Sequence, residues 1–148
     1  MVERYTKFAA AVAKISTCIQ KIESEAMASY GLKGSCAQYI TAIRLSEDGM
    51  TISQLSETCM KDKAAVSRTI AELEEKGVVV RETQGTNCYR APIVLTEKGQ
   101  EIAEFVAQRA AAAVKIAGLD GEERHNMYAG LNVIAQNLNE ICKDGIKE

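Results

Sequence analysis

The sequence contains few aromatic residues, one proline and one histidine. Its 148 residues include no Trp, two Phe and five Tyr, and the only proline and histidine are Pro92 and His125. Scarce proline and many alanines favour long helices over a β-sandwich or barrel, with a core of Ala, Ile, Leu, Val and Met. Because catalytic zinc needs several His, Cys or carboxylate ligands at set spacings, one histidine argues against a zinc enzyme. It also argues against a Ser-His-Asp triad, since no nucleophile motif accompanies it.

Neither a strong charge of one sign nor a long hydrophobic run is present. The 18 basic and 20 acidic residues give a net charge of -2, which excludes a polycationic nucleic-acid binder but permits a local basic patch. Uncharged apolar stretches such as residues 110–114 are far shorter than the about 20 residues that a membrane span needs. The N-terminus has no apolar signal segment. We therefore expect a soluble, cytoplasmic protein with no membrane partner.

The cysteines do not form a disulfide or metal-binding pattern. They are odd in number and widely spaced, and no two form a C-x-x-C pair, which is typical of reduced thiols. The sequence therefore predicts no metal site. Since no polar constellation suggests catalysis, it also predicts no cofactor and no enzymatic activity. The five cysteines are Cys18, Cys36, Cys59, Cys88 and Cys142.

Long helices with apolar seams are expected at both ends of the chain. The first runs from about Tyr5 to Tyr30, and the last begins at Asp120, where Glu123 completes a capping-box pattern. Another helix opens at Thr96. A short chain with such seams at both ends is expected to pair with a second copy of itself. The seams, spaced by three and four residues, are Phe8, Val12, Ile15, Ile19 and Ile22 in the first helix, and Met127, Leu131, Ile134, Leu138 and Ile141 in the last.

The middle of the chain has the element order of a winged helix-turn-helix. One helix starts near Thr51 and breaks at Met60, and the next begins at Asp62, a good N-cap, with an apolar face of Val66, Ile70 and Leu73. Two extended runs around a polar tip then predict a hairpin. The expected fold is mainly α, with a winged helix-turn-helix between terminal helices that form a dimerisation region. The expected elements are helices over 35–45, 51–59 and 62–76, strands over 78–83 and 91–95, and a tip at 84–87.

The helix that begins at Asp62 is suited to reading DNA. Residues 61–70 carry three basic residues and one acid, whereas residues 71–77 carry three acids and one base. A groove-reading helix usually enters by its N-terminal end, where the helix dipole also favours phosphate. Small outward side chains allow close approach to base edges, and an arginine can contact a guanine in bidentate fashion. The candidate DNA contacts are Lys61, Lys63, Ala64, Ser67 and Arg68 on the helix and Thr86, Asn87 and Arg90 on the wing.

Taken together, residues 50–57, 61–77 and 95–99 resemble the MarR (multiple antibiotic resistance regulator) family. The combination D-K-x-x-V-S-R, L-E-x-x-G-x-V-x-R and L-T-E-K-G carries the resemblance, which covers essentially the whole chain. It implies an obligate homodimer joined through residues 1–34 and 97–148. It also implies a DNA-binding lobe over 35–96 that binds a palindromic operator. The family's Asp-x-Arg wing motif is altered, because Asn87 and Tyr89 occupy those places and Arg90 follows.

Three further interpretations stay open at this stage. The resemblance implies release from DNA by a small aromatic or phenolic effector, and a cavity between the lobes is expected near Met27, Tyr30, Tyr39, Ile43 and Arg44. Relatives that sense organic hydroperoxides use a first-helix cysteine with second-helix tyrosines, which makes Cys18 and Cys36 candidate redox sensors. A winged-helix protein-interaction module without DNA binding is the third. The sequence does not distinguish a repressor from an activator, although a repressor is the expectation.

Overall fold

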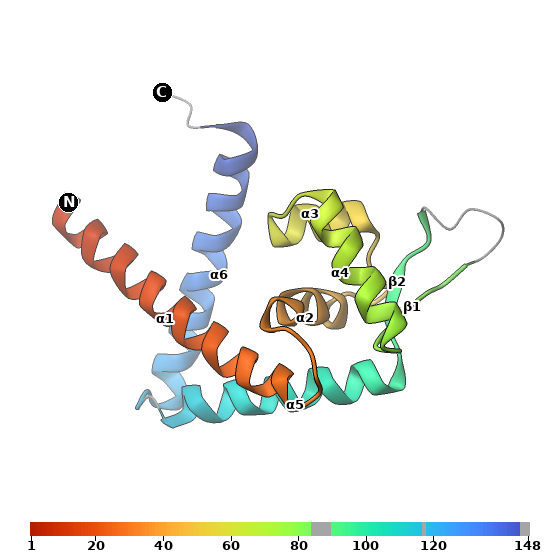
Figure 1. Cartoon of the computed structure of the whole chain (residues 1–148). Coiled ribbons are helices and arrows are strands. Elements are labelled where there is room, and N and C mark those ends of the chain that lie inside the picture. Colours follow the sequence, from red (N-terminus) through yellow and green to blue (C-terminus); the bar gives the residue numbers. More distant parts are fainter. Residues whose placement is uncertain (84–89, 117, 146–148) are drawn as a thin grey trace. The chain divides into compact units, whose positions relative to one another are not determined.

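The structure is a computed structural model that describes residues 1–83, 90–116 and 118–145 (Figure 1). It is mainly helical with one small antiparallel sheet, as expected. The chain divides into two compact units, residues 1–112 and 113–148. The elements are α1 (Val2–Ala28), a 3-10 turn η1 (Gly34–Cys36), α2 (Ala37–Leu45), α3 (Ile52–Cys59), α4 (Lys63–Glu75), β1 (Val79–Arg81), β2 (Ile93–Leu95), α5 (Glu97–Ile116) and α6 (Gly121–Asp144).

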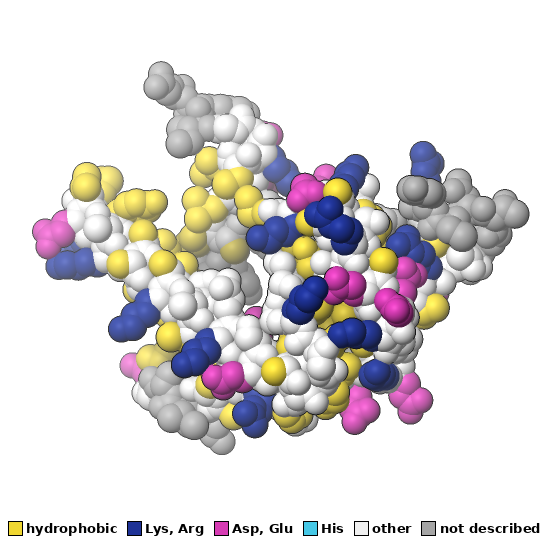
Figure 2. Space-filling model, in the orientation of Figure 1, with side chains coloured by type: hydrophobic (Ala, Val, Ile, Leu, Met, Phe, Trp, Pro, Cys, Tyr) yellow, Lys and Arg dark blue, Asp and Glu magenta, His cyan; other side chains and the backbone are white. Residues whose placement is uncertain are grey.

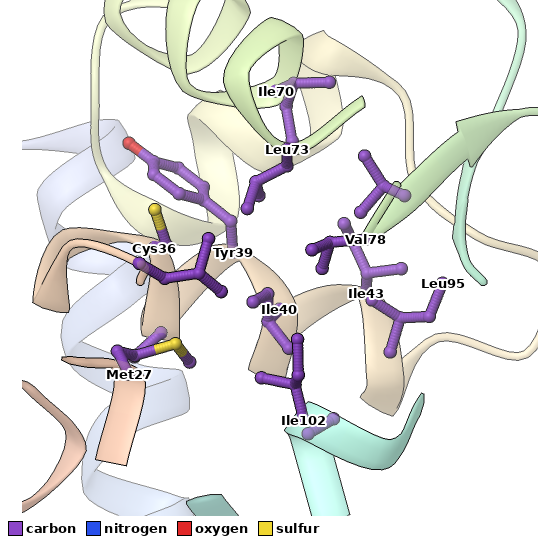
Figure 3. Close-up of a cluster of buried hydrophobic side chains, with 14 of the residues drawn as sticks. Met27, Cys36, Tyr39, Ile40, Ile43, Ile70, Leu73, Val78, Leu95 and Ile102 are labelled. Atoms are coloured by element: carbon purple, nitrogen blue, oxygen red, sulfur yellow. The ribbon is translucent and has the colours of Figure 1, made fainter. Parts of the chain in front are cut away.

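The core of the first unit is aliphatic and draws on every element from α1 to α5. Figure 3 shows Met27 of α1 and Ile102 of α5 beside the α2 and α4 side chains. The expectation of a core without large aromatics is confirmed except for Tyr39, whose side chain is only 3% exposed. The fully buried side chains include Met27, Ile40, Leu55, Val66, Ile70, Leu73, Val78, Ile93 and Ile102.

Side-chain caps define both helices of the helix-turn-helix. Thr51 and Gln54 form a capping box at the start of α3, and Asp62 accepts the Ala65 N–H at 2.9 Å to begin α4. Met60 ends α3 in the left-handed conformation, with φ 52°. The predicted boundaries of these two helices are therefore confirmed to within about one residue. The second helix begins two residues later than expected, because Ser35 lies in the η1 turn rather than in α2.

The sheet is shorter than the extended runs in the sequence. β1 and β2 pair antiparallel, with Val79 opposite Leu95 and Arg81 opposite Ile93. Met50 pairs with Ile93 on the other side of β2. The predicted strands over 78–83 and 91–95 were too long, because Pro92 has no N–H to donate and the ladder stops beside it.

The start of α5 is held against the loop that joins α4 to β1. The Thr96 hydroxyl accepts the Gly99 N–H at 3.1 Å and donates to the Gly77 carbonyl at 2.6 Å, so Thr96 caps α5 as expected. A Cβ atom on Gly99 would lie 2.1 Å from the Val78 carbonyl oxygen. Only glycine therefore allows the first turn of α5 to approach this backbone so closely.

The terminal helices expose their apolar seams. α6 begins with the predicted capping box between Asp120 and Glu123. Its seam residues Leu131, Ile134, Leu138 and Ile141 are 38–51% exposed, and on α1 the seam residues Phe8, Val12 and Ile15 are 39–56% exposed. In the described parts of the chain, no helix is both long enough and apolar enough to traverse a bilayer.

We expect Gly99→Ala to lower the free energy of unfolding by about 1–3 kcal/mol, because the new methyl group would push the α5 backbone away from Val78. The matched control is Gln100→Ala at the next, exposed helical position, which should change stability by less than about 0.5 kcal/mol. Urea unfolding followed by circular dichroism measures both. Equal stability of the two variants would contradict the close approach at Gly99.

Candidate nucleic-acid interface

Packing of α4 against the core fixes which of its side chains face outward. Val66, Ile70 and Leu73 are fully buried, as the sequence predicted. Successive helical residues are rotated by about 100°, so burial of this face leaves the opposite face in solvent. The predicted contact residues Lys63, Ala64, Ser67 and Arg68 are all exposed, and Lys61, in the turn before α4, is exposed as well.

The N-terminal half of α4 and the turn before it carry cations that have no partner in the part of the chain that the structure describes. Within the described residues, the side chains of Lys61, Lys63 and Arg68 form no ion pair or hydrogen bond. Figure 2 shows several Lys and Arg side chains over α3 and α4, with acidic side chains among them. These cations are free to bind phosphate, because no ion pair or hydrogen bond to another described residue has to be broken first.

The C-terminal half of α4 is acidic, and two of its carboxylates are already paired. Glu72 accepts from Lys33 Nζ at 3.2 Å, and Glu74 accepts from Arg81 Nε at 3.0 Å. Arg81, at the end of β1, is thus paired with an acid. The Lys33–Glu72 pair was missed, because residues 39 positions apart leave no local pattern.

The wing is described only at its base. Thr86 and Asn87 lie outside the described residues, and Arg90 is exposed. An open pocket of about 610 Å³ lies at the base of the wing, beside Arg90. No sequence pattern indicates this pocket, because its acidic wall comes partly from the turn after α2. Its lining residues are Glu47, Asp48, Glu82, Arg90, Ala91, Pro92 and Val94.

The residues expected around an effector cavity are packed together in this conformation. Met27, Tyr39 and Ile43 belong to the core, with at most 3% of each side chain exposed. Tyr30 packs edge-on against Phe105 with ring centroids 5.5 Å apart. Met27, Tyr39 and Ile43 are therefore core residues in this conformation, and an effector-binding role stays a prediction.

Arg44, the remaining member of that set, forms an ion pair with Glu104 on α5. Hydrogen bonds from Gln108 and from Arg44 hold the pKa of Glu104 below its ordinary value. The Glu104 carboxyl group is therefore ionised at neutral pH, and the pair ties α2 to α5.

The candidate redox cysteines lie in different surroundings. Cys18 is exposed on α1, whereas Cys36 is buried and only 2% exposed. Burial raises the pKa of the Cys36 thiol, which disfavours the reactive thiolate. Of the two candidates, only Cys18 is accessible to an oxidant. Nor do the described residues bring together three or more His, Cys, Asp or Glu side chains in a group that could hold a metal ion.

We expect Cys36 to react with iodoacetamide more slowly than Cys18 in the folded protein at pH 7.5, because its thiol is buried and mostly protonated. Quenched labelling followed by peptide mass spectrometry measures both rates. Labelling in urea is the control, since the difference should vanish once the chain unfolds. Labelling of Cys36 as fast as Cys18 in the folded state would show that the Cys36 site is open.

Known proteins resemble this chain in the helix-turn-helix segment and in the whole fold. The family model described as MarR family matches residues 30–87. A MarR transcriptional regulator from Methanosarcina mazei Go1 superposes with a TM-score of 0.76 at 20% identity, covering 90% of both chains. A MarR family transcriptional regulator from Listeria monocytogenes, complexed with 26mer DNA, gives 0.75 at 21% identity, covering 95% of this chain and 96% of that one.

A third similar structure contains a small molecule. CouR from Rhodococcus jostii RHA1, bound to p-coumaroyl-CoA, gives a TM-score of 0.67 at 18% identity, with 95% of both chains covered. No curated protein matches the sequence. At these identities the solved structures establish the winged-helix fold, and the match over residues 30–87 identifies its helix-turn-helix segment. Residues 30–87 therefore resemble the MarR family of transcriptional regulators, and the whole chain shares the fold of the solved MarR structures.

Proposed function

We infer that this protein regulates transcription by binding an operator as a homodimer, with α4 of each protomer in a major groove. The observation that carries the proposal is the outward face of α4. It presents Lys63 and Arg68 without partners among the described residues, while its opposite face is buried. The Listeria structure complexed with DNA supports this use of the fold.

Each candidate residue has a distinct role in the proposal. Arg68 donates two hydrogen bonds to a guanine edge or a phosphate, and Ser67 contacts either. The small side chain of Ala64 allows close approach to the base edges. Lys61 and Lys63 neutralise phosphates. On the wing, Thr86, Asn87 and Arg90 contact phosphates or the minor groove.

The proposed dimer sets the form of the operator. Two α4 helices related by a two-fold axis read the halves of a palindrome whose centres are about one helical turn apart. The exposed seams of α1 and α6 supply the apolar surface for pairing. Occupation of a promoter by such a dimer blocks transcription, so we propose a repressor, acting in the cytoplasm where its DNA lies.

Release by a small aromatic or phenolic effector is part of the proposal. The CouR structure with p-coumaroyl-CoA supports it. Because Met27, Tyr39 and Ile43 are packed here, an effector near them must favour a conformation in which they separate, and it shifts the population toward that state. Oxidation of the exposed Cys18 is the alternative trigger, for which Cys36 is poorly placed.

We expect Arg68→Ala to weaken binding to the preferred operator by about 1–3 kcal/mol, because a bidentate contact is lost. The operator is first selected from a pool of random duplexes, and fluorescence anisotropy at two salt concentrations then measures affinity. Lys14→Ala removes the same charge from an exposed site on α1 and is the control. Wild-type affinity of Arg68→Ala, or an equal loss in Lys14→Ala, would contradict the assignment.

We expect Leu138→Glu to convert the dimer into monomers, because it places a charge in the seam of α6. Leu138 is 51% exposed in the single chain, so the substitution should leave the protomer folded. Gln136→Glu adds the same charge at an exposed position outside the seam and should stay dimeric. Sedimentation velocity distinguishes the two. A dimeric Leu138→Glu variant would show that this seam is not the interface.

A further inference from the structure

We propose that the Glu74–Arg81 ion pair positions the base of the wing, where Arg90 lies, relative to the groove-reading end of α4, so that both reach the same duplex. The inference rests on the proposed function and adds to it two residues that need not touch DNA. Both are positioning residues, since they act through the elements they join.

The pair is the most enclosed ion pair of the described residues. Arg81 Nε donates to Glu74 Oε1 at 3.0 Å, and the two side chains are 22% and 31% exposed. Every other described ion pair has at least one side chain more than half exposed. A partly buried pair is screened less by solvent and fixes geometry more firmly than a surface pair.

The pair also fixes the register of β1. Val79 is buried, Val80 is 48% exposed, and Arg81 again points inward, toward α4. A shift of one residue would turn Arg81 outward and Val80 inward. An arginine on the inner face is tolerated only with a nearby acid, because an unpaired charge there would lose its hydration. Glu74 therefore selects one register of a strand that is only three residues long.

The pair lies between α4 and the wing, the two elements proposed to contact DNA. Glu74 follows Arg68 by six residues, or about 9 Å along the axis of α4. Arg81 is the last residue of β1, and Glu82, at the base of the wing, donates its N–H to the Pro92 carbonyl at 2.9 Å. On the other side of this base, Arg90 precedes β2 by three residues. A change at the pair therefore shifts the base of the wing, where Arg90 lies, while the buried face of α4 keeps its place.

The test compares two substitutions with the same charge change. Glu74→Gln removes the ion pair, and Glu75→Gln removes an exposed carboxylate one residue away that forms no ion pair or hydrogen bond with the described side chains. On the selected operator we expect Glu74→Gln to bind about tenfold more weakly. Glu75→Gln should bind as tightly as the wild type, since it leaves the ion pair intact and lies at the end of α4 that faces away from the duplex. The double variant Glu74→Arg with Arg81→Glu should recover most of the affinity.

The readout specific to positioning is a double-mutant cycle with Arg90→Ala. In the wild-type background Arg90→Ala should weaken binding by about fivefold, and in the Glu74→Gln background by less than about twofold, because Arg90 is no longer held against the duplex. Thermal unfolding checks that every variant is folded. A merely structural role would leave the effect of Arg90→Ala equal in both backgrounds.

The outcomes separate this inference from the proposed function. Equal affinities of Glu74→Gln and Glu75→Gln, or an Arg90→Ala effect that is the same in both backgrounds, would overturn the inference while selective binding by the wild type upholds the proposed function. A wild-type protein that enriches no duplex from the random pool would overturn both.

Discussion

The burial of one face of α4 is the constraint on which the rest of the structure depends. Val66, Ile70 and Leu73 have no exposed surface, and each contributes about 1.5–3 kcal/mol by leaving water. The helical repeat then dictates that Lys63 and Arg68 face solvent. A rotation of α4 by one residue would expose part of the apolar face and bury charge. The packing that stabilises the lobe is therefore the same packing that presents its cations.

Basic and acidic residues are separated along α4, although the protein as a whole is almost neutral. The cations of the N-terminal half have no ion-pair partner among the described residues, and the carboxylates Glu72 and Glu74 in the C-terminal half are held by Lys33 and Arg81. A net charge of -2 is thus compatible with a local surface that attracts phosphate. The paired acids tie α4 to neighbouring segments at the end that faces away from the proposed duplex.

Local features of the structure were predictable from the sequence, and contacts between distant residues were not. Caps such as Asp62 and the Asp120–Glu123 capping box depend on residues three positions apart. The starts of these helices could therefore be predicted from the local sequence. The Arg44–Glu104 pair joins residues 60 positions apart and left no pattern. The strands were overestimated because β-branched runs continue past the point where pairing stops. The outward face of α4 was predictable, whereas the packing around Tyr39 depends on the tertiary fold.

Contact between the N-terminal half of α4 and DNA can be tested directly by NMR. Amide chemical shifts of the ¹⁵N-labelled protein are recorded during titration with the selected operator duplex. We expect the largest changes over residues 61–70 and near Arg90, with small changes over residues 72–76. Changes concentrated over 72–76, or on the terminal helices alone, would contradict it.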